Sequence, residues 1–538
     1  MQFAMPRPPS TESVALRDEA KRLAESQRIA DKLRNAEAYR SFSGSDSIVV
    51  HETHGSWVFL AGDYAYKVKK PIKTGFLDYG TLSKRKHCCD QEVRLNRRYA
   101  PDLYLDVVPI TERDGEIRVE GTGEAVEFAV KMRRFPGDAL LSDCLKKGKI
   151  ATEEVLQLAE TVASFHEAAA SSDSKRRWGD PEVVFREAID NFTDLRGQFS
   201  SSPLESNQLE QLDRLELWTR QAYRRLEELL EQRHDQGFIR ECHGDLHLNN
   251  VVRLDGKWTP FDGIEFNEEF RWIDILSDAA FLAMDFAAQG HLDLERSFVS
   301  AYLEQTGDYQ AVPLMRWYLV YRAMVRGKVA AIRSSQPNQT AQALQTERRD
   351  CLEHVGLAEQ LTKSEAPRLW ITHGVSGSGK STGTEGLIQQ HGALRLRSDV
   401  ERKRLFGFRP SQRPRDEAQQ RQLYSHSATQ QTYERLAELA SMLLRSGAPV
   451  VVDATFLQRR FRDMFQAIAA QENVPFRIVP FSADVSELER RIVERRRQHS
   501  DASDATLEVL RQQLDSLEPL TPDERQLAEI PSGQIGGS

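Results

Sequence analysis

The segment Gly374–Ser381, with the sequence GVSGSGKS, constrains the fold of this chain more than any other stretch. It follows the spacing G-x-x-x-x-G-K-[ST], in which glycines let backbone N–H groups turn inward around phosphate oxygens. An apolar run, Leu369–His373, comes directly before it, and a helical pattern comes directly after it. A strand, a glycine-rich turn and a helix in this order predict a phosphate-binding loop (P-loop) rather than an ordinary glycine turn.

Each position of the P-loop has an expected role. Lys380 is expected to reach the β- and γ-phosphates of a nucleoside triphosphate, and the Ser381 hydroxyl is expected to ligate Mg²⁺. The helix that opens at Lys380 adds the positive end of its dipole. The segment therefore predicts a site for ATP and Mg²⁺, formed by Gly374, Val375, Ser376, Gly377, Ser378, Gly379, Lys380, Ser381 and Thr382.

Strand candidates alternate with helical segments through this part of the chain. Such alternation predicts a parallel sheet that helices cover on both faces. From about residue 367 the chain is therefore expected to form an α/β P-loop domain. Its strands are expected at Leu369–His373, Ala393–Arg397, Val450–Asp453 and Phe476–Phe481.

Two aspartates stand at the ends of these strands. Asp453 closes the run Pro-Val-Val-Val-Asp, where P-loop proteins carry the carboxylate that supports Mg²⁺. A turn or cap aspartate is the alternative. Asp399 follows the strand that ends at Arg397, and it is a candidate to orient or deprotonate an acceptor hydroxyl. For Asp399 the alternative is an ordinary helix N-cap.

A later helical segment, Glu487–Arg497, carries five arginines. Arginines on a mobile helix can close over phosphates and neutralise the charge of the transition state. Arg491 and Arg495 stand four residues apart on one face and are the candidates for this role. The alternative is a solvated basic face whose arginines pair with the glutamates of the same helix.

The segments GVSGSGKST, RSDVERKR, VVVDATF and RRIVERRR together resemble small P-loop kinases. These are gluconate kinase, the kinase part of polynucleotide kinase and zeta-toxin-like kinases. The resemblance spans about residues 367–515. It implies a kinase-type P-loop domain, but it does not identify a substrate.

A second motif, H-x-D-x-x-x-x-N, lies within CHGDLHLNN and includes Asp245 and Asn250. Asp262 follows twelve residues after Asn250, beyond a predicted hairpin with an Asp255-Gly256 turn. Kinase-type phosphoryl transfer needs one aspartate at the acceptor hydroxyl, and an asparagine and a second aspartate at Mg²⁺. A loop-capping role for Asp245 is the alternative.

Zinc binding by His243 and His247 is a competing interpretation of this segment, but no third ligand stands at a useful spacing. The sequence also has His-Gly-Asp in place of His-Arg-Asp and lacks Asp-Phe-Gly. In these respects residues 50–330 resemble the aminoglycoside phosphotransferase and choline kinase branch of the protein-kinase-like fold. The resemblance implies that Asp245 is catalytic, that Asn250 and Asp262 ligate metal, and that His243 is structural.

Upstream, SWVFLAGDYAYKVKK alternates around a Gly-Asp turn and predicts a β-hairpin. Lys67 on its second strand resembles the kinase lysine that contacts the α- and β-phosphates. Lys69 points to the same face and is the alternative candidate for this role. Glu92 on the following helix is the candidate partner, with a solvated helix charge as the alternative. No G-x-G-x-x-G loop precedes Lys67 in the sequence.

The whole chain of 538 residues is expected to combine an α+β protein-kinase-like domain with the P-loop domain. Polar stretches at 334–345 and 362–367 interrupt the pattern, and the second is the preferred boundary. The expected parts are a polar helical leader, a kinase-like N-lobe, a helical C-lobe and the P-loop domain, at residues 1–45, 46–136, 137–361 and 367–538.

Composition narrows the class of protein. The net charge of −8 argues against a general nucleic-acid binder. Five cysteines without a C-x-x-C pair favour a reducing cytoplasm over a disulfide framework. The N-terminus lacks the apolar core of a secretory signal, and no stretch approaches the roughly 18–20 apolar residues of a membrane span. A cytoplasmic protein without a membrane partner is expected.

The chain as a whole resembles the bifunctional aminoglycoside-phosphotransferase-like/ATP-binding proteins. The leading hypothesis is an ATP-dependent phosphotransferase with two sites, each acting on a hydroxyl group of a small molecule. In one alternative, one module is a non-catalytic nucleotide sensor that regulates the other. In another, the P-loop domain acts on nucleic-acid ends through the basic stretch Arg395–Arg415, although a solvated helix or an anionic small-molecule site is favoured there. Acceptor identity and oligomeric state are left open.

Overall fold

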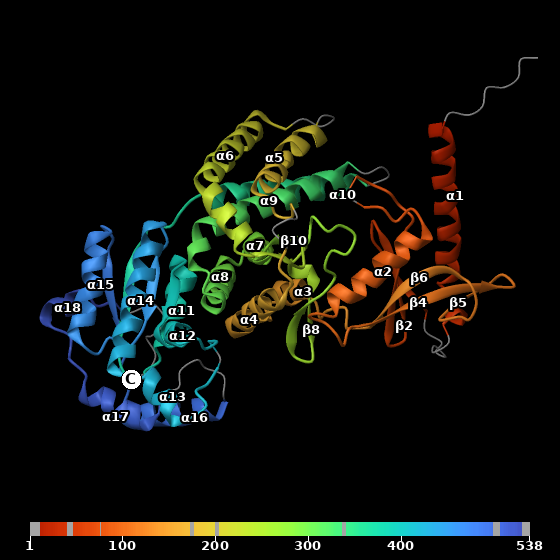
Figure 1. Ribbon diagram of the computed structural model, residues 1–538. Helices are drawn as coiled ribbons and strands as arrows, with labels where there is room; N and C mark the ends of the chain where they lie inside the picture. Colours follow the sequence, from red (N-terminus) through yellow and green to blue (C-terminus); the bar gives the residue numbers. More distant parts are fainter. Residues whose placement is uncertain are drawn as a thin grey trace, which may run out of the picture. The chain divides into compact units, whose positions relative to one another are not determined.

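The computed structural model describes residues 11–39, 47–75, 77–172, 177–199, 204–335, 340–410, 412–498 and 506–529. The chain forms two compact units, each described by itself below (Figure 1). The first unit consists of Met1–Lys149, Ala168–Gly179 and Gly237–Asp274. The second consists of Ile150–Glu167, Asp180–Gln236 and Ile275–Ser538. Most of the helices expected to form a C-lobe therefore share a unit with the P-loop sheet, and the domain limits given above stay a prediction.

The first unit is built on a six-stranded antiparallel sheet with the order β1-β2-β3-β6-β4-β5. The predicted hairpin is present, because β2 and β3 pair on either side of the turn at Gly62-Asp63. The strands are β1 Val49–Glu52, β2 Ser56–Ala61, β3 Tyr64–Lys69, β4 Tyr104–Arg113, β5 Glu116–Val119 and β6 Ala125–Arg133.

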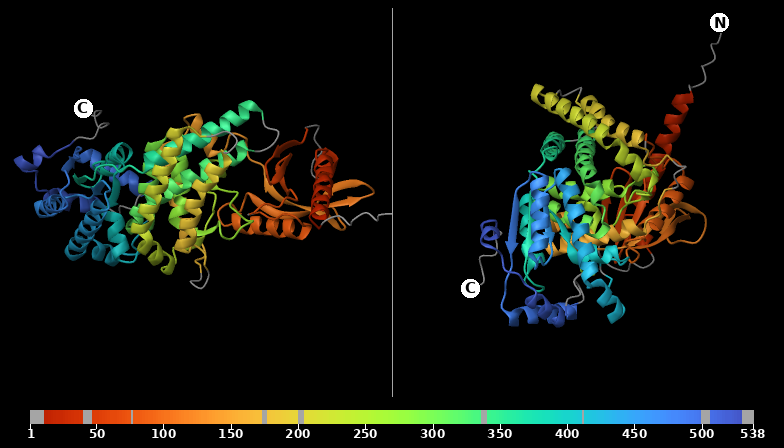
Figure 2. Two further views of the ribbon diagram at one scale, coloured as in Figure 1. Left: turned by 90° about the horizontal axis from the view of Figure 1, so that it is seen from above. Right: turned by 60° about the vertical axis from the view of Figure 1, so that its left-hand side comes forward.

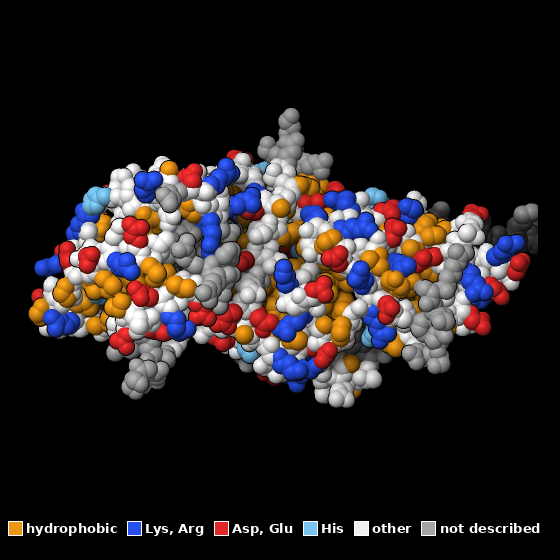
Figure 3. Space-filling view, turned by 90° about the horizontal axis from the view of Figure 1, so that it is seen from below, with side chains coloured by type: hydrophobic (Ala, Val, Ile, Leu, Met, Phe, Trp, Pro, Cys, Tyr) orange, Lys and Arg blue, Asp and Glu red, His pale blue; other side chains and the backbone are white. Residues whose placement is uncertain are grey.

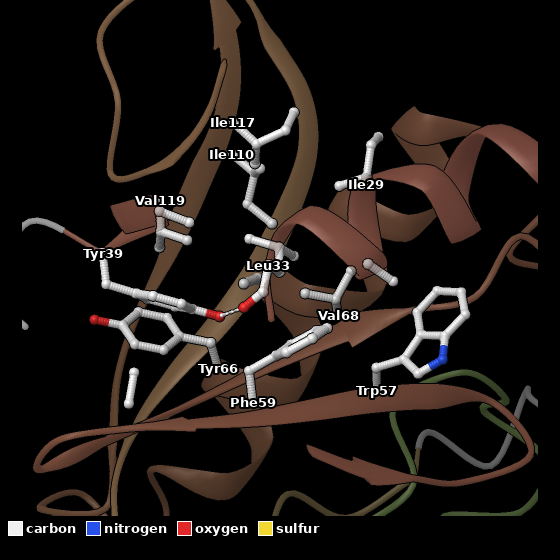
Figure 4. Packing of buried hydrophobic residues seen from close by; sticks show 14 of the residues in the cluster. Ile29, Leu33, Tyr39, Trp57, Phe59, Tyr66, Val68, Ile110, Ile117 and Val119 are labelled. Atoms are coloured by element: carbon white, nitrogen blue, oxygen red, sulfur yellow. Dashed lines mark hydrogen bonds between the residues drawn. The ribbon is translucent and has the colours of Figure 1, made fainter. Parts of the chain in front are cut away.

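A helix from the expected leader packs on this sheet. Helix α1 (Thr11–Lys32) and the turn η1 (Ala36–Ala38) bury Ile29, Leu33 and Tyr39 against residues of β2–β5 (Figure 4). The Tyr39 hydroxyl donates to the Leu33 carbonyl at 2.8 Å. Arg28 binds both carboxylate oxygens of Glu112 on β4, at 2.8 and 2.6 Å.

Helix α2 (Leu82–Asn96) packs against β4 and β6 through a separate apolar cluster. The Thr81 side chain caps its first turn by accepting from Lys84 N, so this helix begins where a threonine can satisfy an unpaired N–H group. The helix presents Glu92 and Asn96 as buried polar residues. Apolar packing therefore fixes the helix that carries the predicted partner of Lys67.

The remainder of the first unit holds the H-x-D segment between two small β structures. Strands β7 (Ile239–Glu241) and β10 (Trp272–Asp274) pair antiparallel on one side of it. The predicted hairpin follows on the other side, with β8 (Val251–Leu254) paired to β9 (Lys257–Pro260). The other short elements are α3 (Leu141–Lys146) and the turn η2 (Leu248–Asn250), which contact each other.

In the second unit, helices surround α7, which is buried over nearly its whole length. Figure 2 shows these helices in colours from gold through yellow to green. They are α4 Thr152–Ala168, α5 Pro181–Gln198, α6 Ser206–Asp235, α7 Ile275–Ala288, α8 Leu292–Thr306, η3 Tyr309–Ala311, α9 Val312–Ser334 and α10 Ala341–Leu361. Helix α7 packs against α8 and α9, and α8 also contacts α11 and β12 of the P-loop region.

The predicted parallel sheet is present, with the order β12-β13-β11-β14. Its strands are β11 Leu369–His373, β12 Leu394–Arg397, β13 Val450–Asp453 and β14 Phe476–Pro480. The helices are α11 Lys380–His391, α12 Ser398–Leu405, α13 Glu417–Leu423, α14 His426–Arg445, α15 Arg459–Gln471, α16 Val485–Gln498, α17 Leu507–Asp515 and α18 Pro522–Gln526. Since all four strands run the same way, the residues that follow them meet at one edge.

Within the described residues, none of the helices combines the length and the apolar character that a bilayer crossing requires.

Candidate functional sites

In the first unit, Lys67 on β3 joins two predicted site residues. Its Nζ atom lies 2.9 Å from Oε1 of Glu92 and 2.5 Å from Oδ1 of Asp262. The Glu92 side chain is fully buried, whereas that of Asp262 is 40% exposed. The structure thus brings together a lysine, its helix partner and a predicted metal ligand from three distant segments of the chain.

Lys69, the rival of Lys67 in the sequence, binds the other oxygen of the same glutamate. Its Nζ atom lies 2.6 Å from Oε2 of Glu92, and it also donates to Oε1 of Glu265. The Tyr79 hydroxyl donates to that same Glu265 oxygen. Lys69 and Glu265 are both buried, so Lys69 belongs to the interior of the site and Lys67 to its open side.

Sequence reasoning missed Glu265 and Tyr79. Glu265 stands three residues after Asp262, in the segment Asp-Gly-Ile-Glu, so its proximity to Asp262 was the available signal. Tyr79 lies in a loop before α2, and no motif marks it. The contact of Tyr79 with Lys69 and Glu265 depends on how the loop packs.

The charges of this network support one another. Burial by itself raises the pKa of Glu92, but Lys67 and Lys69 outweigh burial and lower this pKa to about 2. Burial by itself lowers the pKa of Lys67, but Asp262 and Glu92 outweigh it and raise the pKa above its ordinary value. Glu92 and Lys67 are therefore both charged at neutral pH.

His243 has a structural position beside Asp245. Its Nδ1 accepts from the backbone N–H of Asp245 at 3.3 Å, and its Nε2 lies 2.8 Å from the Phe261 carbonyl oxygen. Since Nδ1 accepts, Nε2 carries the proton, and the ring ties the H-x-D segment to the residue before Asp262. Within the described residues, no group of three metal-ligating side chains includes both His243 and His247.

Asp245 and Asn250 contact each other across their loop. The Asn250 Nδ2 donates to the Asp245 carbonyl oxygen at 3.0 Å and to its carboxylate at 3.2 Å. This leaves the Asn250 Oδ1 as an oxygen acceptor. Phe261 N donates to the Asn250 carbonyl at 2.9 Å, so the β8–β9 hairpin returns the chain to this point as predicted. Oxygen donors from Asn250 and Asp262 fit the preference of Mg²⁺.

The turn at Asp262-Gly263 is fixed by α2 and by two tyrosines. Asp262 has a φ of 62°, and its N–H donates to the Tyr104 hydroxyl at 3.0 Å. Gly263 N donates to Oδ1 of Asn96 at 2.9 Å. A Cβ atom at Gly263 would lie 2.4 Å from the Tyr99 hydroxyl oxygen, so only glycine fits without displacement. The position of Asp262 is therefore set from the same helix that carries Glu92.

In the second unit, the P-loop has the backbone that its glycines imply. Gly374 has a φ of 152°, and a Cβ atom there would lie 2.4 Å from the Phe481 carbonyl oxygen. The Lys380 Nζ donates to the carbonyls of Gly374 and Val375, at 3.0 and 2.7 Å. Ser376 N donates to Oε1 of Gln513 at 2.7 Å, a contact that no sequence motif indicated.

Ser381 and Asp453 meet at the edge of the parallel sheet. The Ser381 hydroxyl donates to Oδ2 of Asp453 at 2.7 Å, and Asp453 is buried at the end of β13. Strands β11 and β13 are neighbours, which places the residues after them side by side. A hydroxyl and a carboxylate oxygen in contact form a donor set that suits Mg²⁺.

A cavity of about 2070 Å³ surrounds these residues within the second unit. Its lining includes residues 376–383 of the P-loop and of the first turn of α11, together with Asp399, Asp453 and Arg491. Asp399 lies in the first turn of α12, whose N-cap position is Arg397, so Asp399 is not the cap of this helix. A nucleotide occupies only part of such a volume, which leaves space for a second small molecule.

The arginine helix lies over the P-loop. The Arg491 Nη1 is 3.4 Å from the Gly377 carbonyl oxygen, and its Nε donates to Glu487 at 2.6 Å. Arg491 thus lies at the P-loop and also pairs with a glutamate of its own helix. The side chain of Arg495 lies outside the described part of the structure.

The basic stretch considered for nucleic-acid binding is folded inward in its first part, whereas Arg409 and Arg415 in its second part are exposed. Arg395, Arg402 and Lys403 are buried, and Arg404 forms an ion pair with Glu401. Figure 3 shows acidic and basic side chains interspersed over the face in view. The side chains of the first part therefore serve contacts within the unit more than a solvated face.

One family model matches the P-loop part of this chain, and two mycobacterial proteins match most of its length. The family model described as AAA domain matches residues 369–520. Rv2004c of Mycobacterium tuberculosis is 31% identical over 461 residues, which cover 85% of this chain and 88% of the relative. Mb2027c of Mycobacterium bovis matches to the same extent.

Two solved structures align with parts of this chain at low sequence identity. A choline kinase from Cryptosporidium parvum is 12% identical and covers 63% of this chain and 96% of its own, with a TM-score of 0.39. A gluconokinase from Sinorhizobium meliloti is 22% identical and covers 30% of this chain and 81% of its own, with a TM-score of 0.22. The chain belongs to the same family as the mycobacterial proteins, and its residues 369–520 form a P-loop domain that matches the AAA domain model.

Proposed function

We propose that this protein transfers the γ-phosphate of ATP to hydroxyl groups of small molecules, at two separate sites. The observation that carries the proposal is the position of Lys67 in the first unit, whose Nζ atom lies 2.9 Å from Glu92 and 2.5 Å from Asp262. Asp245 and Asn250 stand on the loop that the β8–β9 hairpin links to Asp262. This set matches the needs of phosphoryl transfer.

In the first site, Lys67 would bind phosphate oxygens while Glu92 holds its ammonium group in place. Asp245 would orient the acceptor hydroxyl and accept its proton. Asn250 and Asp262 would hold Mg²⁺, which when bound neutralises charge on the transferring phosphoryl group. His243 would keep the segment before Asp262 in register with Asp245.

In the second site, Lys380 would exchange its two carbonyl partners for phosphate oxygens, and backbone N–H groups of the P-loop would surround them. Ser381 and Asp453 would hold Mg²⁺, and Asp399 would orient the acceptor. Arg491 would stabilise charge on the phosphates. For Arg495 the same role, stabilising charge on the phosphates, stays a prediction from the sequence.

The acceptor proposed for this site is a small polar molecule, because both acidic and basic side chains line the cavity. We also place the protein in the cytoplasm, since all five cysteines are buried thiols, as suits a reducing compartment.

A panel of hydroxylated metabolites with labelled ATP tests the proposal, using the full chain and the variants Asp245→Ala and Lys380→Ala. Each variant is expected to abolish one of two separable transfer activities. Unchanged transfer to every acceptor in both variants would overturn the proposal. ATP binding without transfer at one site would instead favour the nucleotide sensor, and steeply salt-dependent oligonucleotide binding would favour action on nucleic-acid ends.

A further inference from the structure

Helix α8 contacts α11 and β12 of the P-loop region, and Figure 1 shows α8 beside α11. This helix carries a buried carboxylate. Glu304, near its end, is 4% exposed. Its two oxygens accept from two arginines of β12, at 3.1 Å from Arg395 Nε and 3.3 Å from Arg397 Nη1. One acid from the helical part thus holds two cations of the parallel sheet.

Arg395 connects this acid to the P-loop. Its Nη1 donates to the Ser381 carbonyl oxygen at 3.1 Å and lies 3.4 Å from Oε2 of Glu385. Ser381 is the residue whose hydroxyl contacts Asp453. Arg395 is itself only 6% exposed. Its guanidinium therefore bonds to both Glu304 and the Ser381 carbonyl in the interior, so the position of Ser381 depends on that of Glu304.

Arg397 connects Glu304 to the carboxylate at the proposed metal position. Its Nε lies 3.9 Å from Oδ2 of Asp453, beyond hydrogen-bond distance but well within the range of charge attraction. Glu304 and Asp453 therefore attract the same guanidinium. Arg397 forms a hydrogen bond to the Glu304 carboxylate, at 3.3 Å, whereas its distance to the Asp453 carboxylate is 3.9 Å.

The contact between α8 and the P-loop region is extended and polar. Arg296 donates to the carbonyls of Gln389 and Gln390, at 2.9 and 2.8 Å. These carbonyls lie in the last turn of α11 and lack hydrogen-bond partners within the helix, so Arg296 supplies them. Ser297 donates to Glu385 at 2.6 Å. These bonds fix α8 against the helix that begins at Lys380.

We propose that Glu304 is a positioning residue of the P-loop site, supplied by the helical part of the chain. By holding Arg397, it leaves the Asp453 carboxylate free to support Mg²⁺, and by holding Arg395 it supports the backbone of Ser381. The inference rests on the proposed binding of Mg²⁺ and nucleotide at this site. It follows that residues from about 367 onward do not form a complete site by themselves.

The test measures binding of fluorescent ADP to the full chain as Mg²⁺ is varied, in an Asp262→Asn background that weakens metal binding at the other site. The variant Glu304→Gln is expected to raise the half-saturating Mg²⁺ concentration by roughly three- to tenfold, the effect of one altered ion pair. ADP binding in EDTA is expected to stay within about twofold of the parent. A merely structural role would weaken binding equally with and without Mg²⁺, and that result would overturn the proposal.

Three further variants sharpen the test. Glu304→Asp keeps the charge and is expected to retain most of the Mg²⁺ response, and Asp293→Asn, at an exposed position of α8, is the matched control that should leave it unchanged. Arg397→Gln removes the competitor for Asp453, so alone it should lower the Mg²⁺ requirement, and with Glu304→Gln it should reverse the defect. An unchanged Mg²⁺ response in Arg397→Gln would overturn the proposal even if Glu304→Gln failed to fold.

Failure of the proposed function is distinguishable from failure of this inference. If Lys380→Ala leaves ADP binding unchanged in the Asp262→Asn background, the nucleotide does not bind at the P-loop and the proposed function fails there. If Lys380→Ala abolishes binding but Glu304→Gln leaves the Mg²⁺ response unchanged, only the role of Glu304 is wrong.

Discussion

Lys69 and Glu92, neither of which is exposed to solvent, meet at 2.6 Å inside the first unit. The same glutamate binds Lys67 through its other oxygen. One buried carboxylate therefore binds two lysines of one strand. Removing any one of these three side chains changes the charge balance of the site. The predictions below follow from this network and from the turn beside it.

Glu92→Gln is expected to destabilise the protein by about 3–5 kcal/mol, because it leaves the buried Lys69 ammonium and the partly buried Lys67 ammonium without their shared carboxylate. Chemical denaturation, followed by a probe in the first unit, measures the loss. Glu124→Gln, at an exposed position of the same unit, is the control and should change the free energy of unfolding by about 0.5 kcal/mol or less. A loss as small as that of the control would contradict the pairing.

Lys67→Met is expected to impair mainly the activity, whereas Lys69→Met is expected to impair mainly the stability. Lys67 lies at the open side of the site beside Asp262, so its loss should lower kcat/KM for the first activity by about 100-fold or more with a smaller effect on stability. Lys69 is fully buried between Glu92 and Glu265, so its loss should mainly lower the free energy of unfolding. Steady-state kinetics and denaturation of both variants decide the point. If the folded Lys69→Met protein loses the activity and Lys67→Met keeps it, the two roles are reversed.

Gly263→Ala is expected to destabilise the turn at Asp262 by about 1–3 kcal/mol, because the new methyl group meets the Tyr99 hydroxyl oxygen at 2.4 Å. The first activity should fall with it, since the turn positions a proposed metal ligand. Adding Tyr99→Phe removes the obstructing oxygen and should restore part of the loss. Gly137→Ala, where a Cβ atom meets nothing within 4 Å, is the control. Rescue that fails in the double variant would show that the collision is not the cause.

Acid should lower the free energy of unfolding of the first unit, because it protonates Glu92. Its pKa is lowered from about 4.5 to about 2 by Lys67 and Lys69, against the effect of burial. A carboxylate with a lowered folded-state pKa stabilises the fold above its unfolded pKa, and the contribution is lost as pH falls from about 4.5 towards 2. The full effect is on the order of 3 kcal/mol.

Denaturation at several pH values between 6 and 3 measures this slope, and Glu92→Gln should show a flatter one (about 1.4 kcal/mol less change per pH unit at most). Parallel slopes for the two proteins would mean that Glu92 is not the group responsible.

Local spacing accounts for the parts of the sites that could be predicted. Gly374–Ser381 forms a loop directly after a strand, and the chemistry of that loop depends on residues within eight positions. Asp245 and Asn250 likewise share one loop, and a short hairpin carries the chain from Asn250 to Asp262. Such features are set by steric and hydrogen-bonding preferences of neighbouring residues, so a pattern reveals them.

The sequence by itself thus determined the P-loop, the H-x-D loop and the alternation of strands and helices around them. Only the tertiary structure decided that Lys69 pairs with Glu265, 196 residues away, and that Arg395 turns inward to Glu304 instead of lying on a basic surface. Both contacts join segments far apart in the chain. Their formation depends on the packing of whole helices against sheets, and burial then makes an opposite charge obligatory for each cation.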